Sequence, residues 1–195
     1  EQAFRRDVIS LPDGDIPWFD RACTASTMDD AAAMVREGVT GWAIVTAGAQ
    51  HSGRGTRGRE WNSPPGKGLW MSAILPPPGD PDQLEKLPLK AAEALEKALE
   101  ELTGGRFVIK HPNDLMSRGR KLAGIIVETV TMGEDIISVV LGLGLDISAE
   151  EKDFIQAKLP EATSLRIETG CAPGRREIIE AFLRQFKPVY SSPAP

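Results

Sequence analysis

Short apolar runs bounded by turn residues recur along the chain, and runs of this kind favour β-strands. They lie at 17–20, 42–47, 68–75, 107–109, 122–130 and 136–147. Three consecutive prolines end the third run, and a Met-Gly-Glu-Asp turn separates the last two. The pattern therefore predicts a sheet in which several strands are joined by tight turns.

Three other stretches repeat their apolar residues at the helical spacing of three to four positions. The first begins after Ser26, a favoured helix-capping residue, and stops at Gly38. The second covers 84–102, with Pro88 near its start, and the third covers 175–186. Strands joined by turns and followed by helices predict an α+β domain: a mixed, largely antiparallel sheet with helices packed on one face.

Length and composition favour one domain. The chain has 195 residues, of which 41% are hydrophobic and 26% charged, as is usual for a globular protein with a sizeable core. We expect this domain to fill residues 1–187 and residues 188–195 to form a disordered tail. We expect no DNA-binding domain before it and no small barrel after it.

Charge and hydropathy restrict the partners of the protein. The net charge of −5 argues against a general nucleic-acid binder, so no DNA partner is expected. No apolar run approaches the ~20 residues of a membrane helix, and the first residues lack the apolar core of a signal peptide. We therefore expect a cytoplasmic protein that does not contact a membrane.

A basic, glycine-rich loop interrupts this acidic chain at 50–61. Its arginines, Arg54, Arg57 and Arg59, are interleaved with glycines. Glycine lets the backbone pass close to a ligand, and guanidinium groups match the oxygens of phosphates and carboxylates. The loop therefore predicts a site for an anionic small molecule, although a solvated basic loop or an RNA-binding Arg-Gly segment has the same composition.

A second cationic segment, 106–121, contains Asp114 as its single acidic residue. An apolar run ends in Lys110, a Pro-Asn-Asp turn follows, and a second β-type run begins at Lys121. This order places Lys110, Asn113, Asp114 and Lys121 near one another at the mouth of a hairpin. An ordinary hairpin with charged ends would have the same pattern.

Short motifs also occur in a definite order along the chain. They are STM at 26–28, the basic loop at 50–61, GLWMS at 68–72, KHPNDL at 110–115, KLAG at 121–124, GLGLD at 142–146 and ATSL at 162–165. In this order and spacing, between residues 16 and 186, they resemble the catalytic domain of biotin protein ligases, within the wider biotin and lipoate protein ligase family. The resemblance implies the class II synthetase-like fold of that domain.

The same resemblance implies an activity. The chain would be an ATP-dependent ligase that activates biotin as biotinyl-5'-AMP and transfers it to a specific lysine of a biotin carboxyl carrier domain. It would bind ATP, biotin and Mg²⁺, and the carrier domain would be its protein partner. A lipoate or octanoate protein ligase or transferase of the same family, and a non-catalytic vitamin-binding homologue, remain as alternatives. Whether the chain forms a homodimer is open.

Individual roles also follow from the resemblance. Lys121 would stabilise charge and Asp114 would orient and deprotonate the incoming lysine, which makes them the catalytic pair. The residues expected at biotin are Ser26, Thr27, Gln50, Gly53, Arg54, Gly124, Gly142 and Gly144. Those expected at ATP or the adenylate are Arg54, Gly55, Thr56, Arg57, Arg59, Trp61, Lys110, Asn113 and Lys121, with Asn113 also a weak Mg²⁺ ligand. A strand-end surface lysine and an Asx-turn aspartate are the plain alternatives for the catalytic pair.

Three positions depart from the family pattern. Thr56 stands where the loop usually has arginine, His111 replaces a tryptophan, and Asp146 ends a run that usually ends in asparagine. An ionised aspartate only accepts hydrogen bonds, whereas asparagine also donates them. We therefore expect these positions to affect adenylate retention and acyl specificity, and not the fold.

Overall fold

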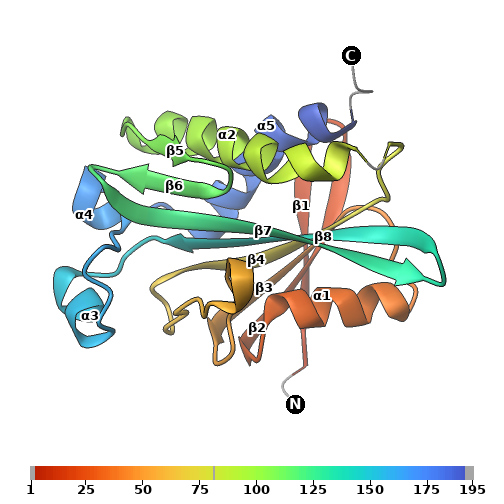
Figure 1. The fold of residues 1–195 in the computed structure, drawn as a ribbon, viewed down its shortest axis with the longest axis horizontal. Coiled ribbons are helices and arrows are strands. Elements are labelled where there is room, and N and C mark those ends of the chain that lie inside the picture. The colour runs from red at the N-terminus through yellow and green to blue at the C-terminus, as the bar shows by residue number, and fades with distance from the viewer. Residues whose placement is uncertain (1–2, 81, 192–195) are drawn as a thin grey trace.

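The computed structural model describes residues 3–80 and 82–191, which are built around an eight-stranded sheet (Figure 1). The strands are β1 (Arg5–Leu11), β2 (Gly14–Thr24), β3 (Ala43–Gln50), β4 (Gly68–Leu75), β5 (Val108–Lys110), β6 (Asp114–Ser117), β7 (Arg120–Met132) and β8 (Asp135–Asp146). The helices are α1 (Thr27–Arg36), α2 (Gln83–Thr103), α3 (Glu151–Gln156), α4 (Leu165–Thr169) and α5 (Arg175–Ser191), with a 3₁₀ turn, η1 (Thr56–Gly58). The α+β class predicted from the sequence is confirmed.

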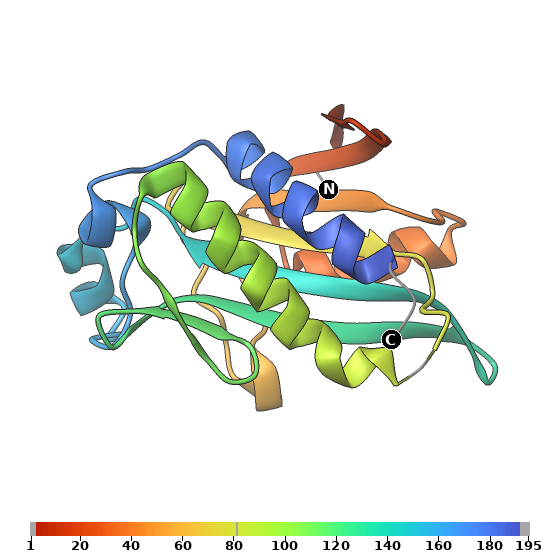
Figure 2. The same cartoon turned by 90° about the horizontal axis from the view of Figure 1, so that it is seen from above.

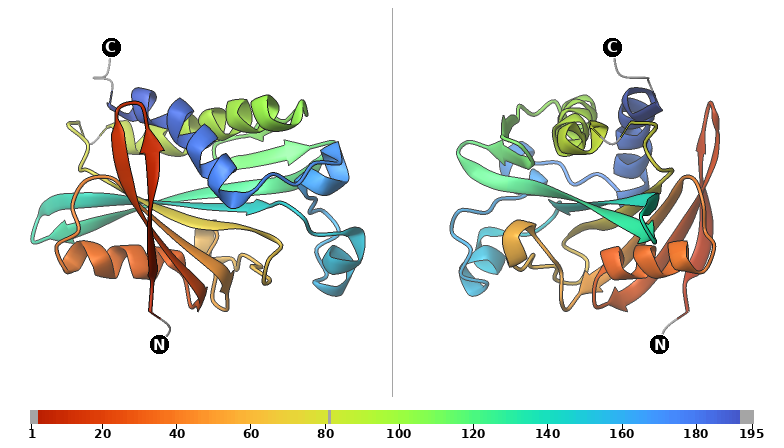
Figure 3. Two further views of the ribbon diagram at one scale, coloured as in Figure 1. Left: turned by 180° about the vertical axis from the view of Figure 1, so that it is seen from behind. Right: turned by 45° about the vertical axis from the view of Figure 1, so that its right-hand side comes forward.

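The order of the strands across the sheet is β1-β2-β3-β4-β8-β7-β6-β5. Neighbouring strands are antiparallel except β2 and β3, which are parallel. A parallel pair needs a crossover connection, and α1 supplies it between these two strands. The sheet is therefore mixed and largely antiparallel, as predicted. The β1–β2 hairpin and the β5–β6 hairpin form its two edges (Figure 3).

Helices cover both faces of this sheet. α2 and α5 lie side by side on one face, whereas α1 packs against the other (Figures 1 and 2). Along β3, Ile44 belongs to the core beneath α2 and α5, while Ala43 and Val45 belong to a smaller core beneath α1. The prediction that the helices pack on one face is therefore wrong for α1. The near-continuous apolar run of β4, which is buried at every position, is the sequence sign of a strand covered on both faces.

Four elements, β1, β6, α3 and α4, were not predicted from the sequence, because their residues show no clear apolar pattern. β1 is an edge strand in which Ile9 is the one fully buried side chain, so it has no apolar run. β6 has four residues, and α3 and α4 have six and five, which is too short to show a period. Of these, β6 matters most for the site, because it carries Asp114 to the side of β7.

The last helix is longer than predicted. α5 continues to Ser191, so residues 188–191 are helical and the prediction of a disordered tail is wrong for them. Residues 192–195, the rest of the predicted tail, lie outside the described residues.

Aromatic contacts hold the end of α5. Tyr190 is buried, lies edge-on to Trp42 and contacts Phe186. Its hydroxyl donates a hydrogen bond to the carbonyl oxygen of Pro76, and burial raises the pKa of Tyr190 to about 12. The end of α5 is thereby fixed to the end of β4.

No helix within residues 3–80 and 82–191 is long and apolar enough to cross a membrane.

Candidate active site

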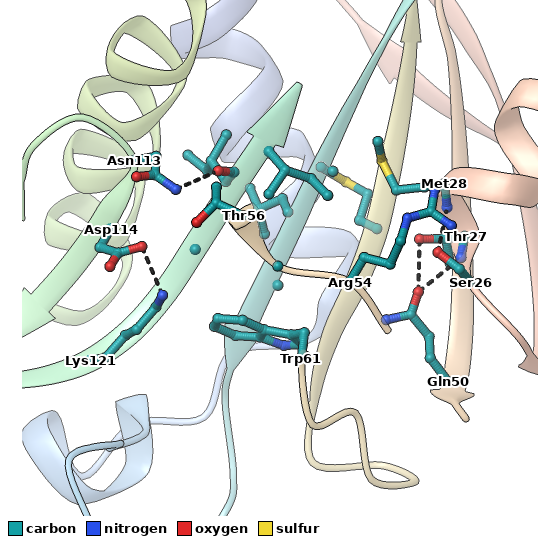
Figure 4. Close-up of a pocket in the computed structure, with 18 residues that line it drawn as sticks. Ser26, Thr27, Met28, Gln50, Arg54, Thr56, Trp61, Asn113, Asp114 and Lys121 are labelled. Carbon is teal, nitrogen blue, oxygen red and sulfur yellow. Dashed lines mark hydrogen bonds and ion pairs between the residues drawn. The ribbon is translucent and has the colours of Figure 1, made fainter. Parts of the chain in front are cut away.

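A cavity lies between α1, the basic loop and the strands β7 and β8, and we call it the first cavity (Figure 4). Its free volume is about 30 Å³. The residues predicted from the sequence that line it are Ser26, Thr27, Gln50, Arg54, Gly55, Thr56, Trp61, Asn113, Asp114, Lys121, Gly124, Gly142 and Gly144. The fold thus brings together side chains from five separate segments of the sequence.

The apolar wall of the first cavity was missed by the sequence analysis. It consists of Met28, Met71, Ile125, Ile126 and Leu143. In the sequence these residues look like ordinary core residues of a helix and of strands, and the available signal was that Met28, Met71 and Leu143 lie within the motifs STM, GLWMS and GLGLD.

Glycines on two neighbouring strands form the floor of this cavity. Gly124 on β7 pairs with Gly144 on β8, and the indole of Trp61 lies over both. A Cβ atom on Gly144 would collide with that indole, and one on Gly142 would lie 2.6 Å from the sulfur of Met28. The absence of side chains here is therefore what lets other groups lie flat on the sheet.

Buried polar groups fasten the start of the loop to α1. The Gln50 side chain accepts a hydrogen bond from the backbone N–H of Thr27 at 2.8 Å and donates one to the Ser63 hydroxyl at 2.8 Å. The Thr27 hydroxyl lies 2.8 Å from the hydroxyl of Ser72 on β4, and Ser26 caps α1. Thr27 and Gln50, two of the residues predicted to bind biotin, therefore belong to one largely buried network, which includes Ser72, a residue to which the sequence analysis gave no role.

Arg54 reaches both walls of the first cavity from the loop. Its guanidinium group binds Asp29 on α1 at 2.6 Å and Glu128 on β7 at 3.3 Å. Burial lowers the pKa of Arg54, but hydrogen bonds and charge from these two carboxylates outweigh it and leave the pKa raised. The side chain stays cationic and ties the loop to both walls.

The loop itself is a narrow hairpin. The backbone N–H of Trp61 donates to the carbonyl oxygen of Gly53 at 2.8 Å, and the backbone N–H of Gly55 donates to the carbonyl oxygen of Arg59 at 2.7 Å. A Cβ atom on Gly53 would lie 2.5 Å from the Trp61 carbonyl oxygen, so glycine is required where the two arms meet. Gly53 does not line the first cavity, which favours a structural role for this residue.

An arginine lies beside Thr56, the position that departs from the family pattern. The guanidinium group of Arg59 donates to the Thr56 hydroxyl at 2.8 Å and to its carbonyl oxygen at 3.2 Å. Arg57 is exposed, as Arg59 is, but it has left-handed backbone angles. Positive charge is therefore present next to Thr56, although residue 56 does not supply it.

Lys121 and Asp114 form an ion pair at the edge of the first cavity, with 2.8 Å between Nζ and Oδ1 (Figure 4). The Lys121 ammonium also lies 5.2 Å from the centre of the Trp61 ring. A bulge in the pairing of β6 and β7 leaves Leu122 as an extra residue, so that Met116 pairs with Lys121. This irregularity turns the lysine toward the aspartate.

The predicted single hairpin is in fact two. β5 pairs with β6, and β6 pairs with β7, so β6 lies between the two strands that the sequence analysis joined. Asp114 and Lys121 still meet, but Lys110 lies on the outer strand. With Arg57 and His111 it lines an open groove of about 1220 Å³ that also borders Asn113. The structure thus separates Lys110 and Arg57 from the first cavity.

The backbone of Lys121 is held by a neighbouring segment. Its N–H donates to the carbonyl oxygen of Glu161 at 2.7 Å, and its carbonyl oxygen accepts from Thr163 at 2.8 Å. The Thr163 hydroxyl in turn donates to Glu168 at 2.6 Å, as does the guanidinium group of Arg120 at 3.0 Å. The Glu168 carboxylate therefore anchors the strand end that presents Lys121.

Replacing Glu168 with alanine should lower the free energy of unfolding by about 3–5 kcal/mol, because three donors would lose a carboxylate that is only 2% exposed. Burial raises the pKa of Glu168, but hydrogen bonds from Thr163, Ser117 and Arg120 outweigh it and the pKa is lowered. The carboxylate therefore stabilises the fold at any pH above the ordinary pKa of glutamate. This contribution is lost as the pH falls from that value through the lowered pKa of Glu168. Urea unfolding at pH 7 and pH 4 measures both effects.

The matched control is Glu151→Ala. Glu151 binds the same Arg120 at 2.8 Å but is 58% exposed, so its loss should cost at most about 1 kcal/mol. Equal losses in the two variants, or a Glu168 effect that does not shrink in acid, would contradict this account.

Asn113 meets one requirement of a magnesium ligand. Its amide nitrogen donates to the carbonyl oxygen of Ile125 at 2.9 Å, which leaves the amide oxygen for another partner. Within the described residues, no group of three or more His, Cys, Asp or Glu side chains could hold a metal ion. A Mg²⁺ ion at Asn113 would therefore take most of its ligands from phosphate and water.

A second cavity, of about 420 Å³, lies on the other side of Trp61. It shares Gln50, Gly55, Thr56, Trp61 and Lys121 with the first cavity, and it is also lined by Gly53, Arg59, Asp146 and the apolar side chains of Phe154 and Leu159. Burial raises the pKa of Asp146 to about 8, and the charge of Lys121 opposes this shift. Lys121 and Trp61 thus stand at the junction of two cavities.

Comparison with known proteins identifies this arrangement. The sequence pattern described as the biotin/lipoate A/B protein ligase family matches residues 22–146. The chain belongs to this family. Within it, the chain is 32% identical over 166 residues to the bifunctional ligase/repressor BirA of Bacillus subtilis, and 34% identical over 152 residues to the biotin–[acetyl-CoA-carboxylase] ligase of Paracoccus denitrificans.

Solved structures from the biotin/lipoate ligase family have the same fold. A structure of the biotin protein ligase of Aquifex aeolicus in complex with biotin and ATP matches 88% of this chain and 68% of that one, with a TM-score of 0.75 and 27% identity. The B. subtilis match covers 85% of this chain and 51% of the relative, and the P. denitrificans match covers 76% and 63%. The chain therefore spans about half to two thirds of the length of these family members.

Proposed function

We propose that this chain is the catalytic domain of an ATP-dependent, AMP-forming biotin–protein ligase. The observation that carries the proposal is the position of Lys121, which lines both cavities and pairs with Asp114. A reaction that joins a carboxylate to a phosphate needs a cation where the two substrates meet. The related ligase of A. aeolicus was solved in complex with biotin and ATP, which supports these two molecules as the substrates.

In the first step, the biotin carboxylate attacks the α-phosphorus of ATP, and pyrophosphate leaves. The two reactants are both anions, so an ammonium group between them lowers the barrier. Lys121 would occupy that place, with biotin in the first cavity, which would have to widen from its present volume of about 30 Å³, and the nucleotide extending into the second. The apolar wall of the first cavity would pack against the ring system of biotin, and Ser26, Thr27 and Gln50 would pair its polar atoms.

In the second step, the acceptor lysine attacks the acyl carbon, an amide forms and AMP leaves. An amine with a pKa of ~10.4 attacks only after it loses its proton. Asp114 would accept that proton, since Lys121 engages only one of its carboxylate oxygens. Lys121 would then stabilise the departing AMP.

Further assignments belong to the same proposal. Arg54, Gly55, Thr56, Arg59 and Trp61 would enclose the adenylate, because they line one or both cavities. Arg57 and Lys110 would act only at the pyrophosphate end, since they line the open groove. Mg²⁺ would bind Asn113 and the phosphates. The acceptor would be a lysine of a biotin carboxyl carrier domain, which the name of the P. denitrificans relative supports.

Pyrophosphate release from ATP, measured separately with biotin, lipoate and octanoate, tests the proposal. We expect release with biotin and Mg²⁺ only, since adenylation needs the matching carboxylate as the nucleophile. Release with lipoate or octanoate but not biotin would assign the chain to the lipoate branch of the family. No release with any of the three acids, despite a folded protein, would favour a non-catalytic binding role.

A further inference from the structure

The backbone partner of β7 changes just before the strand reaches Lys121. Its pairing with β8 begins at Ala123 and does not extend to Lys121. Lys121 instead forms a parallel bridge with Ala162, so residues 161–163 replace β8 as its backbone partner. The pairing with β6 is irregular at the same point, because the bulge leaves Leu122 as an extra residue. The position of the Lys121 backbone therefore depends on residues 161–163.

Thr163 ties this segment to a buried carboxylate. Its side chain is fully buried, its backbone N–H donates to the carbonyl oxygen of Lys121 at 2.8 Å, and its hydroxyl donates to Glu168 Oε1 at 2.6 Å. The same carboxylate oxygen accepts a hydrogen bond at 3.0 Å from Arg120, the residue that precedes Lys121. One oxygen atom thus holds both the residue before Lys121 and the residue that binds its carbonyl group.

Glu168 lies on α4, beside the point where β6 ends and β7 begins (Figure 1). Its side chain is 2% exposed, and its other oxygen accepts from the Ser117 hydroxyl at 3.0 Å. Burial raises the pKa of Glu168, but hydrogen bonds from its three donors outweigh it and leave the pKa lowered. The ionised carboxylate makes these hydrogen bonds strong. Since Glu168, Ser117 and Thr163 line neither cavity, their influence on a bound ligand has to pass through Lys121.

The Lys121 ammonium group stands at the end of a flexible four-carbon stem, so a shift of the backbone is passed on to it. A displacement of about 1 Å at a reacting group can slow a reaction by about 10²-fold. The inference rests on the proposed function, in which this ammonium group lies between the two reacting anions. We propose that Thr163, oriented by Glu168, is a positioning residue that holds the Lys121 ammonium group at the junction of the two cavities.

The variant Thr163→Val tests this role, because it removes the hydroxyl and keeps the backbone hydrogen bond to Lys121. At saturating biotin and ATP, its pyrophosphate release should slow about 10- to 100-fold. Its calorimetric Kd for biotin should change less than about threefold, since the residue makes no contact with the first cavity. Thr163→Ser, which keeps the hydroxyl, should restore a rate close to that of the wild type.

The matched control is Ser117→Ala. Ser117 is also buried and donates to Glu168, but it approaches from β6 and binds the other carboxylate oxygen. Urea unfolding should show similar losses of stability in Ser117→Ala and Thr163→Val. The rate of Ser117→Ala should nevertheless stay within about threefold of the wild type. Equal slowing in the two variants would mean that the network supports the fold alone.

A double variant tests whether Thr163 acts through Lys121. In the Lys121→Ala background there is no ammonium group left to position, so adding Thr163→Val should slow the residual pyrophosphate release by less than about twofold. Two independent effects would multiply instead. A further slowing of about 10- to 100-fold in the double variant would overturn the inference.

Acetylation by acetic anhydride tests the position of Lys121 without ligands or turnover. Lys67 is an internal reference, since the side chains of Lys67 and Lys121 are 32% and 30% exposed and each pairs with an aspartate. Loss of an ion pair lets an ammonium group give up its proton more easily, so the ratio of Lys121 to Lys67 labelling should rise at least about threefold in Thr163→Val. Peptide mass spectrometry measures this ratio, which should keep its wild-type value in Ser117→Ala.

The labelling ratio separates this inference from the proposed function. An unchanged ratio in Thr163→Val overturns the inference, as does a wild-type rate of pyrophosphate release in that variant. If the ratio rises but the wild type releases no pyrophosphate with biotin, lipoate or octanoate, Thr163 still positions Lys121 and the ligase proposal fails.

Discussion

Replacing Lys121 with alanine should slow biotin-dependent pyrophosphate release by about 10²- to 10³-fold, the usual scale for losing one electrostatic stabiliser of a transition state. Its ammonium stands where the two cavities join and would offset the charge of both reacting anions. The fold should persist, because the side chain is 30% exposed and contributes little to the core. Single-turnover pyrophosphate release gives the rate, and circular dichroism checks the fold.

Lys67 offers a closely matched control. Its side chain is 32% exposed and pairs with Asp153 at 2.9 Å, much as Lys121 pairs with Asp114, but it lines neither cavity. Lys67→Ala should therefore keep its rate within a few-fold of the wild type, since a partly exposed ion pair contributes little. Wild-type turnover in Lys121→Ala, or equal slowing in both variants, would remove Lys121 from the chemistry.

Replacing Asp114 with asparagine should split the two half-reactions. Transfer to the acceptor lysine should slow by about 10²- to 10⁴-fold, the range for losing a positioned general base, because the amide cannot take the proton of the incoming amine. Formation of the adenylate should change less than about tenfold, since Lys121 keeps its charge and its backbone anchors. Pre-forming the adenylate and then adding a biotin carboxyl carrier domain isolates the second step.

Asp153→Asn is the corresponding control, because this carboxylate also holds a lysine, Lys67, outside both cavities. It should leave both half-reactions near the wild-type rates. If Asp114→Asn slows adenylation as strongly as transfer, Asp114 acts by holding Lys121 in position and is not the base.

Regular elements with strong patterns were predictable from the sequence. The limits of β4 were predicted correctly, because an uninterrupted buried run is bounded by Gly68 and by three prolines. α1 was located by its cap at Ser26, whose side chain does accept the hydrogen bond of a helix start. Periodicity and capping are local properties, so they can be read without knowledge of the partners.

Features that depend on distant partners could not be predicted. The strand β6 is too short to show a pattern, so the sequence predicted one hairpin where the structure has two. The prediction that Asp114 and Lys121 lie near each other is nevertheless correct. The raised pKa of Asp146 arises from burial by segments of the chain that lie on either side of it. The sequence shows that Asp146 stands where the family usually has asparagine. The burial that raises the pKa of its carboxyl group is seen only in the structure.

The double attachment of Arg54 gives the basic loop a dependence on ionic strength. Its partners Asp29 and Glu128 are about half exposed, and dissolved ions weaken ion pairs between exposed groups as the ionic strength rises. Added salt therefore weakens both attachments of Arg54 together, whereas the hydrogen bonds that fasten the start of the loop to α1 remain. An incoming carboxylate or phosphate competes for the same guanidinium group, so its binding would release Asp29 or Glu128, whose carboxylates are about half exposed and can be hydrated instead.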